Sequence, residues 1–214
     1  ADTPHEYLMS ASGNSYDYDI AREPFDSTMA VLGTKSPRGT GQAPDIINDI
    51  VPYSDDTAIF LCATSIYRLD GDPGDAGSRF FLLSDSTGGA FGGAWCKDEA
   101  GILYFMGTRG CVYAYLPNGG MRPLSEDAIP ERLRDIDFNA TRVMLLWDSE
   151  YQGVRVMLTP LDAADVAQAQ EHYFWSRRTK GWYPFTIASD DMQPTATFVG
   201  DGELASTRRA VMGC

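Results

Sequence analysis

Short apolar runs separated by turn residues constrain this chain more than any other feature of its sequence. The clearest runs are Ala94–Cys96, Ile102–Met106 and Cys111–Leu116, which are rich in aromatic and large apolar residues. Each run is too short for a helix and fits a half-buried strand. The intervening Lys97–Gly101 and Gly107–Gly110 carry polar residues and glycine, which favour chain reversal. The stretch therefore predicts an antiparallel meander of three strands.

The same pattern recurs along the chain, which predicts an all-β fold. Further hairpins are expected at Ala58–Cys62 with Ser65–Leu69, Arg142–Trp147 with Val154–Thr159, His172–Trp175 with Gly181–Phe185, and Thr195–Val199 with Leu204–Met212. The last of these is expected to reverse at Gly200–Gly202. Single strands are expected at Phe80–Leu83 and within His5–Gly13.

Three segments depart from this pattern. Ile46–Pro52 fits either a strand or a single helical turn, because the period of its apolar residues is ambiguous. Leu124–Asp137 predicts a short helix capped by Ser125 or Asp127. Residues 160–171 form a predicted insertion with room for a second short helix.

The chain is strongly acidic, with 17 Lys and Arg against 30 Asp and Glu, a net charge of −13 and a pI near 4.4. Nonspecific binding to DNA needs Lys and Arg to displace counterions, so this composition disfavours it. Docking on anionic membranes is disfavoured for the same reason. No apolar run is long enough to span a bilayer, so we expect no membrane insertion. The acidic residues are spread along the chain and predict a solubilising surface.

The cysteines and histidines do not form a metal-binding pattern. They are Cys62, Cys96, Cys111, Cys214, His5 and His172, and no two cysteines form a CxxC pair. This spacing disfavours zinc. All but Cys214 lie beside apolar strand residues, where free cysteine behaves as a small buried hydrophobe. A disulfide framework is not expected at this density, which fits assembly in a reducing cytosol.

The acidic loop Asp70–Gly77 is the best metal candidate. Asp70, Asp72 and Asp75 are closely spaced carboxylates of the kind that calcium binds. Their spacing is not that of an EF-hand loop, and no Glu closes the set. Asp-Gly and Pro-Gly are also ordinary turn formers. A plain turn is therefore the favoured interpretation, with calcium as the alternative.

Three other loops are candidates for binding sites. Gly39–Gly41 follows no predicted strand, and Ser84–Gly93 lacks the lysine and helix of a phosphate cradle. The second loop is therefore expected to be a crossing between sheets. Asn14–Asp19 is acidic and aromatic, and its Tyr16 and Tyr18 either pack on neighbours or form an interaction surface.

A loose internal repeat suggests the arrangement of the strands. Trp95–Phe105 and Trp147–Met157 each begin with Trp, pass through an acidic turn and Gly, and end in a largely apolar run. A hairpin recurs roughly every 30–50 residues, which is the spacing of four-stranded propeller blades. We expect a β-propeller or partial propeller of about four antiparallel blades with short helical insertions, as one domain over residues 1–214. A β-sandwich is the alternative.

The two ends of the sequence bear on its completeness. The chain begins without Met and stops within a predicted strand at Cys214. We therefore expect it to be processed, or to be a fragment of a longer protein.

An ordered set of segments resembles virion proteins of tailed bacteriophages that carry a β-propeller. The segments are Ala30–Thr34, Ile50–Asp56, Ile59–Pro73, Leu83–Asp85, Ala94–Asp98, Gly101–Gly107, Gly110–Tyr113, Leu124–Ser125, Ile129–Pro130, His172–Trp175 and Gly181–Phe185. They cover most of the chain, and the order of the set carries the resemblance, since no single motif is specific. The insertion at 160–171 departs from the expected pattern.

The resemblance implies a structural role in the tail of the virion. It implies a nozzle or hub ring made of several copies of the chain, assembled in the host cytoplasm. Neighbouring adaptor and fibre proteins would be its partners, and genomic DNA would pass through without specific binding. The resemblance supplies no catalytic residues. The sequence therefore predicts a protein that is not an enzyme and has no catalytic, cofactor-binding or metal site.

Two other classes of function stay open. A glycan hydrolase needs two carboxyls across a cleft, and acidic pairs occur at Asp55/Asp56, Asp70/Asp72 and Asp190/Asp191. Neighbours on a strand point to opposite faces, so adjacency alone is weak evidence. A carbohydrate-binding module would use Trp95, Trp147, Trp175 and Trp182 as stacking platforms. Aromatic residues in repeated hairpins more often pack in the core. A serine or cysteine hydrolase is disfavoured because neither histidine lies in a recognisable nucleophile context.

Overall fold

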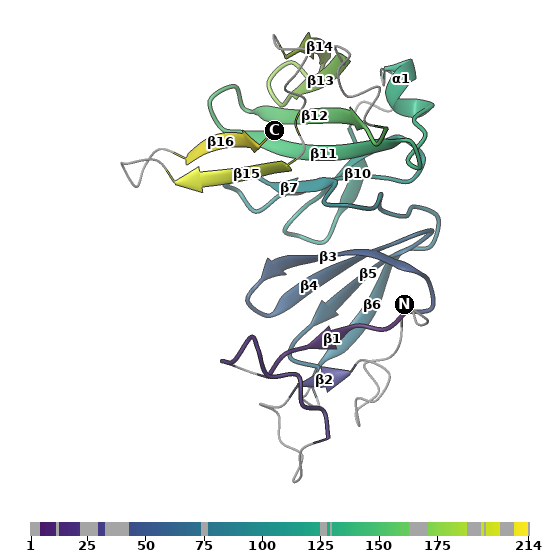
Figure 1. Ribbon diagram of the computed structural model, residues 1–214, viewed down its shortest axis with the longest axis vertical. Coiled ribbons are helices and arrows are strands. Elements are labelled where there is room, and N and C mark those ends of the chain that lie inside the picture. Colours follow the sequence, from purple (N-terminus) through teal and green to yellow (C-terminus); the bar gives the residue numbers. More distant parts are fainter. Residues whose placement is uncertain are drawn as a thin grey trace. The chain divides into compact units, whose positions relative to one another are not determined.

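The computed structural model describes residues 5–11, 13–21, 30–32, 43–73, 77–124, 128, 130–162, 171–187, 194, 196–201 and 208–213. Strands dominate this part of the chain, and the helix α1 (Glu131–Arg134) is a single turn (Figure 1). The all-β expectation is therefore confirmed. The chain divides into two compact units, Ala1–Gly88 and Gly89–Cys214. A single propeller-like domain over residues 1–214 stays a prediction.

The first unit contains a four-stranded antiparallel sheet whose strands follow chain order. Its members are β3 (Ile47–Ser54), β4 (Thr57–Cys62), β5 (Ile66–Asp70) and β6 (Arg79–Ser84). The short strands β1 (Leu8–Met9) and β2 (Val31–Leu32) form a separate pair. The predicted hairpin and the strand at Phe80–Leu83 are confirmed, and the ambiguous segment Ile46–Pro52 belongs to a strand.

One face of this sheet packs on a small aromatic core. Phe60 on β4 contacts Tyr7 and Phe80 edge-to-face, with ring centroids 4.9 Å and 5.2 Å apart. Tyr67 on β5 stacks on Phe80 with centroids 4.9 Å apart. Aromatic pairs across neighbouring strands stabilise a sheet beyond their buried area. These contacts therefore fix which face of β4 points into the core.

Asp45, two residues before β3, holds the turn between β4 and β5. Its Oδ2 accepts hydrogen bonds from the Thr64 amide, the Thr64 hydroxyl and the Ser65 hydroxyl at 2.7, 2.8 and 2.8 Å. Its Oδ1 accepts the Ile46 amide at 2.7 Å. Burial raises the pKa of Asp45, but these hydrogen bonds outweigh burial, so the pKa lies below its ordinary value of 3.8. The ionised carboxylate therefore stabilises the turn.

The second unit begins with the predicted meander, which gains a fourth strand. Its sheet has the order β10-β9-β8-β7, with β7 (Trp95–Lys97), β8 (Leu103–Met106), β9 (Val112–Tyr115) and β10 (Met121–Pro123). The three predicted strands are confirmed, but β10 was not expected. It is short, carries Arg122 and Pro123, and so lacks the apolar run that marks a strand. Its place at the sheet edge tolerates Pro123, which cannot donate to a ladder.

A second four-stranded sheet follows in the same unit. It has the order β11-β12-β13-β14, with β11 (Thr141–Asp148), β12 (Gly153–Pro160), β13 (Glu171–Ser176) and β14 (Trp182–Thr186). Both hairpins predicted for this region are confirmed. The first strands of the three four-stranded sheets begin at Ile47, Trp95 and Thr141, roughly 50 residues apart, which matches the spacing of one blade.

The last described pair corrects one predicted turn. β15 (Ala196–Asp201) and β16 (Arg208–Gly213) are antiparallel, and Asp201 lies opposite Arg208. The predicted reversal at Gly200–Gly202 is therefore wrong, because the ladder continues through Gly200 and Asp201. A glycine-rich signal marks where a strand is able to turn, and pairing across the sheet overrides it here.

An apolar core joins the two four-stranded sheets of the second unit. One side of it includes Cys96, Tyr104 and Ala114, which lie opposite one another on β7, β8 and β9. The other side includes Leu145, Val156 and Tyr173, which are similarly aligned on β11, β12 and β13. Full burial of each large side chain contributes about 1.5–3 kcal/mol before the entropy cost. The two sheets therefore pack face to face.

The other face of β11 is covered as well. Met144, Leu146 and Met157 form a second buried cluster on that face. β11 contacts both β7 and β15. The Thr159 hydroxyl donates a 2.6 Å hydrogen bond to the Pro194 carbonyl, just before β15. First strands of successive sheets in this unit thus lie in the order β7, β11, β15.

The predicted helix is present but short. α1 is shorter than the predicted range Leu124–Asp137, and Pro130 occupies its N-cap position without a side-chain hydrogen bond. The proposed caps Ser125 and Asp127 lie outside the described residues, as do 163–170 of the insertion and the glycines at 39–41.

Gly153 permits the close approach of β12 and β13. A Cβ at this position would lie 2.3 Å from the Trp175 carbonyl oxygen and 2.4 Å from Phe174 Cζ. At Gly181, in the next hairpin, the nearest heavy atom to a Cβ would be 3.5 Å away. The two glycines therefore differ in whether the sheet leaves room for a methyl group.

Gly153→Ala is expected to destabilise the second unit by about 2 kcal/mol, because the clash with backbone cannot be relieved by a rotamer change. Gly181→Ala is the matched control and is expected to change stability by less than about 0.5 kcal/mol. Urea unfolding followed by tryptophan fluorescence reports on this unit, since all four tryptophans lie within it. Equal stability of the two variants would contradict the packing described here.

Asp45→Asn tests the turn in the first unit. The ionised carboxylate is expected to contribute about 2 kcal/mol at neutral pH through its hydrogen bonds. Because the folded-state pKa is depressed, this contribution is present above about pH 4 and is lost as the pH falls through the folded pKa. Hydrogen exchange of the Thr64 amide measures it, with the exposed turn variant Asp55→Asn as control. A gap between wild type and Asp45→Asn that persists at pH 2 would refute the assignment.

Candidate functional site

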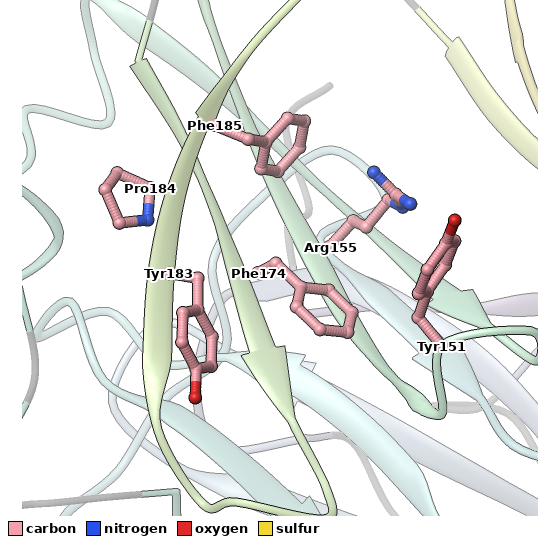
Figure 2. A pocket seen from close by; sticks show the side chains of 6 residues that line it. All are labelled: Tyr151, Arg155, Phe174, Tyr183, Pro184 and Phe185. Carbon is pink, nitrogen blue, oxygen red and sulfur yellow. The ribbon is translucent and has the colours of Figure 1, made fainter.

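A hollow of about 210 Å³ opens on the β11–β14 sheet and is the candidate functional site. Figure 2 shows the side chains that line it, which are Tyr151, Arg155, Phe174, Tyr183, Pro184 and Phe185. They come from the β11–β12 turn and from strands β12, β13 and β14. Most are aromatic, and one is a cation, so the hollow is defined by flat rings around a guanidinium group.

The register of the sheet assembles this group. Arg155 lies opposite Phe174, and Phe174 lies opposite Tyr183, so the three form a row across neighbouring strands. Val154 beside Arg155 belongs to the core between the two sheets. Successive side chains on a strand point to opposite faces, so Arg155 and its row face away from that core. Tyr151 adds a ring at the Arg155 end of the row, as Figure 2 shows.

Arg155 is held by an ion pair with Asp148. Its Nε and Nη2 lie 2.7 and 2.6 Å from Asp148 Oδ2. Asp148 Oδ1 in turn accepts the amides of Glu150 and Tyr151 at 3.1 and 3.0 Å. The side chains of Arg155 and Asp148 are 24% and 8% exposed, so the pair is partly shielded from water. The guanidinium is therefore both fixed in direction and balanced in charge.

Aromatic rings surround the same guanidinium. Arg155 Cζ lies 5.3 Å from the ring centroid of Phe185, 5.7 Å from Phe174 and 5.8 Å from Tyr151. Cation–π contacts of this length are favourable. Tyr151 is 61% exposed and Tyr183 46% exposed, so part of the aromatic surface faces solvent. The site can therefore offer flat apolar faces and guanidinium hydrogen-bond donors to a bound molecule.

A second polar cluster surrounds Asp98, which follows β7. Its Oδ1 accepts the Ala100 and Ile102 amides at 2.9 and 2.8 Å. Its Oδ2 accepts the Tyr104 hydroxyl at 3.3 Å and Arg177 Nη1 at 3.1 Å. The Asp98 side chain has no exposed surface. Because Arg177 comes from the β13–β14 turn, this ion pair joins the two sheets of the unit.

The tryptophans proposed as stacking platforms have structural surroundings. Trp147 and Trp175 are each 3% exposed and belong to the main core. Trp147 stacks on Tyr104 at 5.4 Å and donates its indole N–H to Glu99 Oε2 at 2.8 Å. Trp182 is half-buried and packs against the same core, while Trp95 is half-buried on β7. The core interpretation is confirmed for Trp147 and Trp175.

The acidic candidates are not assembled into one site. Asp70 Oδ1 accepts the Thr57 hydroxyl at 3.1 Å and also pairs with Arg68, so it is occupied within its own sheet. Asp75 lies outside the described residues, as do Asp190 and Asp191. No group of three or more His, Cys, Asp or Glu side chains suited to a metal ion occurs among the described residues. Calcium binding by Asp70, Asp72 and Asp75 thus gains no support from this geometry.

The three cysteines in the described part of the chain are buried, as expected. Cys62, Cys96 and Cys111 are free thiols within the apolar cores. Burial, with a smaller contribution from Asp45, raises the pKa of Cys62 to about 12. Burial also raises the pKa of Cys96. Both side chains are therefore neutral thiols at physiological pH and behave as small hydrophobes.

Two polar loops, Asn14–Asp19 and the turn 176–180, combine exposed side chains with local contacts. In the loop Asn14–Asp19, Asp17 and Asp19 accept amides two residues ahead, so both carboxylates close turns. Tyr16 is 93% exposed, so it does not pack on a neighbour among the described residues. In the basic turn 176–180, Lys180 lies over the Trp175 ring at 5.1 Å. A cation–π contact therefore attaches this turn to the core.

None of the site candidates predicted from the sequence lies in the hollow. A usable signal was present, because Arg155 stands alone between apolar residues on a strand while an aromatic run follows on β13. A charged residue at such a position must either be paired or line a surface. What the sequence could not supply was the register that places Arg155 opposite Phe174.

No family model matches the chain, and no curated protein matches it. In the described part of the chain, no helix has the length and apolar character needed to cross a membrane. The assignment of function therefore depends on the residues and geometry described above.

Asp98→Ala is expected to reduce the free energy of unfolding of the second unit by about 3 kcal/mol, because it leaves the buried Ile102 amide and the Ala100 amide without an acceptor and Arg177 without its partner. Asp98→Asn retains an acceptor and should cost less. The control is Asp135→Ala, which breaks the exposed pair with Arg134 and should cost less than about 0.5 kcal/mol. Urea unfolding measured by tryptophan fluorescence distinguishes them. Similar losses for Asp98→Ala and Asp135→Ala would show that Asp98 does not join the sheets.

Proposed function

We propose that this chain is a structural component of a bacteriophage tail, folded as a β-propeller and assembled into a nozzle or hub ring around the DNA exit channel. The observation that carries the proposal is the series of antiparallel sheets, in which the four-stranded sheets that begin with β7 and β11 are followed by the pair β15–β16, with first strands in contact in the order β7, β11 and β15. A blade exposes apolar faces unless it stacks on others, and radial stacking is how propellers bury them. The ordered resemblance to propeller-bearing virion proteins supplies the biological setting.

The charge of the chain fits this role. A net charge of −13 removes the phosphate attraction that would retain DNA in a channel. Three described carboxylates, those of Asp45, Asp98 and Asp148, each accept several hydrogen bonds from backbone and side-chain donors. Their arrangement supports a structural use of these side chains.

The outer strand β6 offers a surface for contacts between copies. Phe81 and Leu82 are 42% and 54% exposed on this edge strand. Both side chains are apolar and exposed, although as strand neighbours they point to opposite faces of the edge. An edge strand with unpaired backbone groups also favours association. Copies of the chain would meet through this edge in the proposed ring.

The alternative of a glycan-hydrolysing propeller has less support. Asp55 and Asp56 are adjacent residues in an exposed turn, and two carboxyls that act on a glycosidic bond must lie on opposite sides of it. Two of the tryptophans that the glycan-binding alternative would use as stacking platforms, Trp147 and Trp175, are buried in the core. A structural role accounts for more of the described residues.

The test is cryo-electron microscopy of purified virions, with mass spectrometry of their proteins. The chain is expected in every particle, as a ring of propellers on the tail axis. Native mass spectrometry of the full chain should show a ring that Leu82→Lys disrupts and that the nearby exposed variant Ser86→Lys leaves intact. Absence of the chain from virions would refute the tail assignment, whatever the assembly state in solution.

A further inference from the structure

We propose that the hollow formed by Tyr151, Arg155, Phe174, Tyr183 and Phe185 binds one neutral sugar ring of a glycan. This inference goes beyond the tail role and does not depend on it. The face that carries the hollow points away from the core between the sheets, and the hollow contains none of the four tryptophans. The site therefore differs from the tryptophan platforms that the sequence suggested.

The shape of the hollow favours a small flat ligand. Its volume is about 210 Å³, below the 300–1,000 Å³ usual for pockets that enclose a drug-sized molecule. One ring would fill it, and the rest of a chain would extend into solvent. Phe174 and Tyr183 lie side by side across neighbouring strands, which are about 4.8 Å apart. Their rings offer apolar surface to the C–H face of a pyranose.

The charge state of Arg155 selects for a neutral ligand. Asp148 occupies the Nε and Nη2 side of the guanidinium and balances its charge. The other edge, with Nη1, has donors but no net attraction for an anion. Hydroxyl and ring oxygens accept hydrogen bonds from such a donor without adding charge to the site. A phosphate or carboxylate would instead lie near Asp148 with little compensation.

Two exposed tyrosines line the hollow. Tyr151 and Tyr183 combine an apolar ring with a hydroxyl, and both are more than a third exposed. The Tyr183 hydroxyl is oriented by a 3.0 Å hydrogen bond with Thr179 Oγ1. Rings already held in place lose little conformational entropy when a ligand binds. The hollow is thus preorganised for stacking and hydrogen bonding at the same time.

Other occupants fit less well. Single-stranded nucleic acid also stacks on aromatic rings, but it needs cations along its backbone, and the cation of this site is already paired. A second copy of this acidic chain would bring further negative charge toward Asp148. A neutral sugar satisfies the rings and the guanidinium donors together.

The experiment is isothermal titration of the full chain with maltoheptaose, cellohexaose and mannohexaose, and with polygalacturonate and a single-stranded DNA oligonucleotide as charged probes. Saturable binding is expected for at least one neutral glycan, with an affinity that changes less than twofold between 50 and 500 mM salt. Tyr151→Ala and Tyr183→Ala should each weaken it at least tenfold. Tyr16→Ala, which removes an exposed tyrosine from the first unit, should leave it unchanged.

Circular dichroism of each variant confirms folding before the titration. Asp148→Asn provides a second test, because it leaves the guanidinium charge unbalanced and should raise the affinity for polygalacturonate at least tenfold. Absence of binding to every neutral glycan, equal losses in Tyr16→Ala and Tyr151→Ala, or tighter binding of DNA than of any glycan by the wild-type chain would each overturn the proposal. None of these outcomes bears on the presence of the chain in virions.

Discussion

Burial of both faces of the first strands is the constraint on which the second unit depends. In β11, the six consecutive residues Val143–Asp148 are all buried. One face packs on the sheet that contains β7, and the other carries the Met144 cluster beside β15. A single four-stranded sheet cannot bury both faces of its first strand by itself, so β11 needs a neighbour on either side. Stacking of successive sheets follows directly from the composition of these strands.

This constraint explains which parts of the fold could be predicted. Strands such as Leu103–Met106 are short, apolar and bounded by turn residues, so their existence and pairing follow from the sequence. β10 could not be found that way, because Met121–Pro123 forms a strand only through its ladder with β9. The Gly200 turn failed for the same reason, since pairing with Arg209 outweighed the local signal. A strand with its own apolar run can be recognised from the sequence, whereas a strand such as β10 is defined only by its pairing with a neighbour.

The contacts between the two sheets of the second unit could not be predicted from the sequence. Arg177 and Asp98 are 79 residues apart, and only the packing of two sheets brings them within 3.1 Å. Tyr104 stacks on Trp147 across the same junction, although nothing in either segment specifies the other. Buried charges must be paired, so a sequence can show that a partner is needed. It cannot show which of the 17 basic residues supplies it.

A comparison of Asp98 and Asp148 shows how one structural device can serve two purposes. Each follows or ends the first strand of its sheet, accepts backbone amides at Oδ1 and binds an arginine at Oδ2. At Asp98 the arginine comes from the other sheet, so the pair ties the two together. At Asp148 the arginine comes from the adjacent strand, so the pair leaves a fixed, neutralised guanidinium among exposed rings. The two aspartates therefore have different roles in their sheets. Asp98 stabilises the contact between two sheets, whereas Asp148 holds an arginine that is available to the proposed ligand.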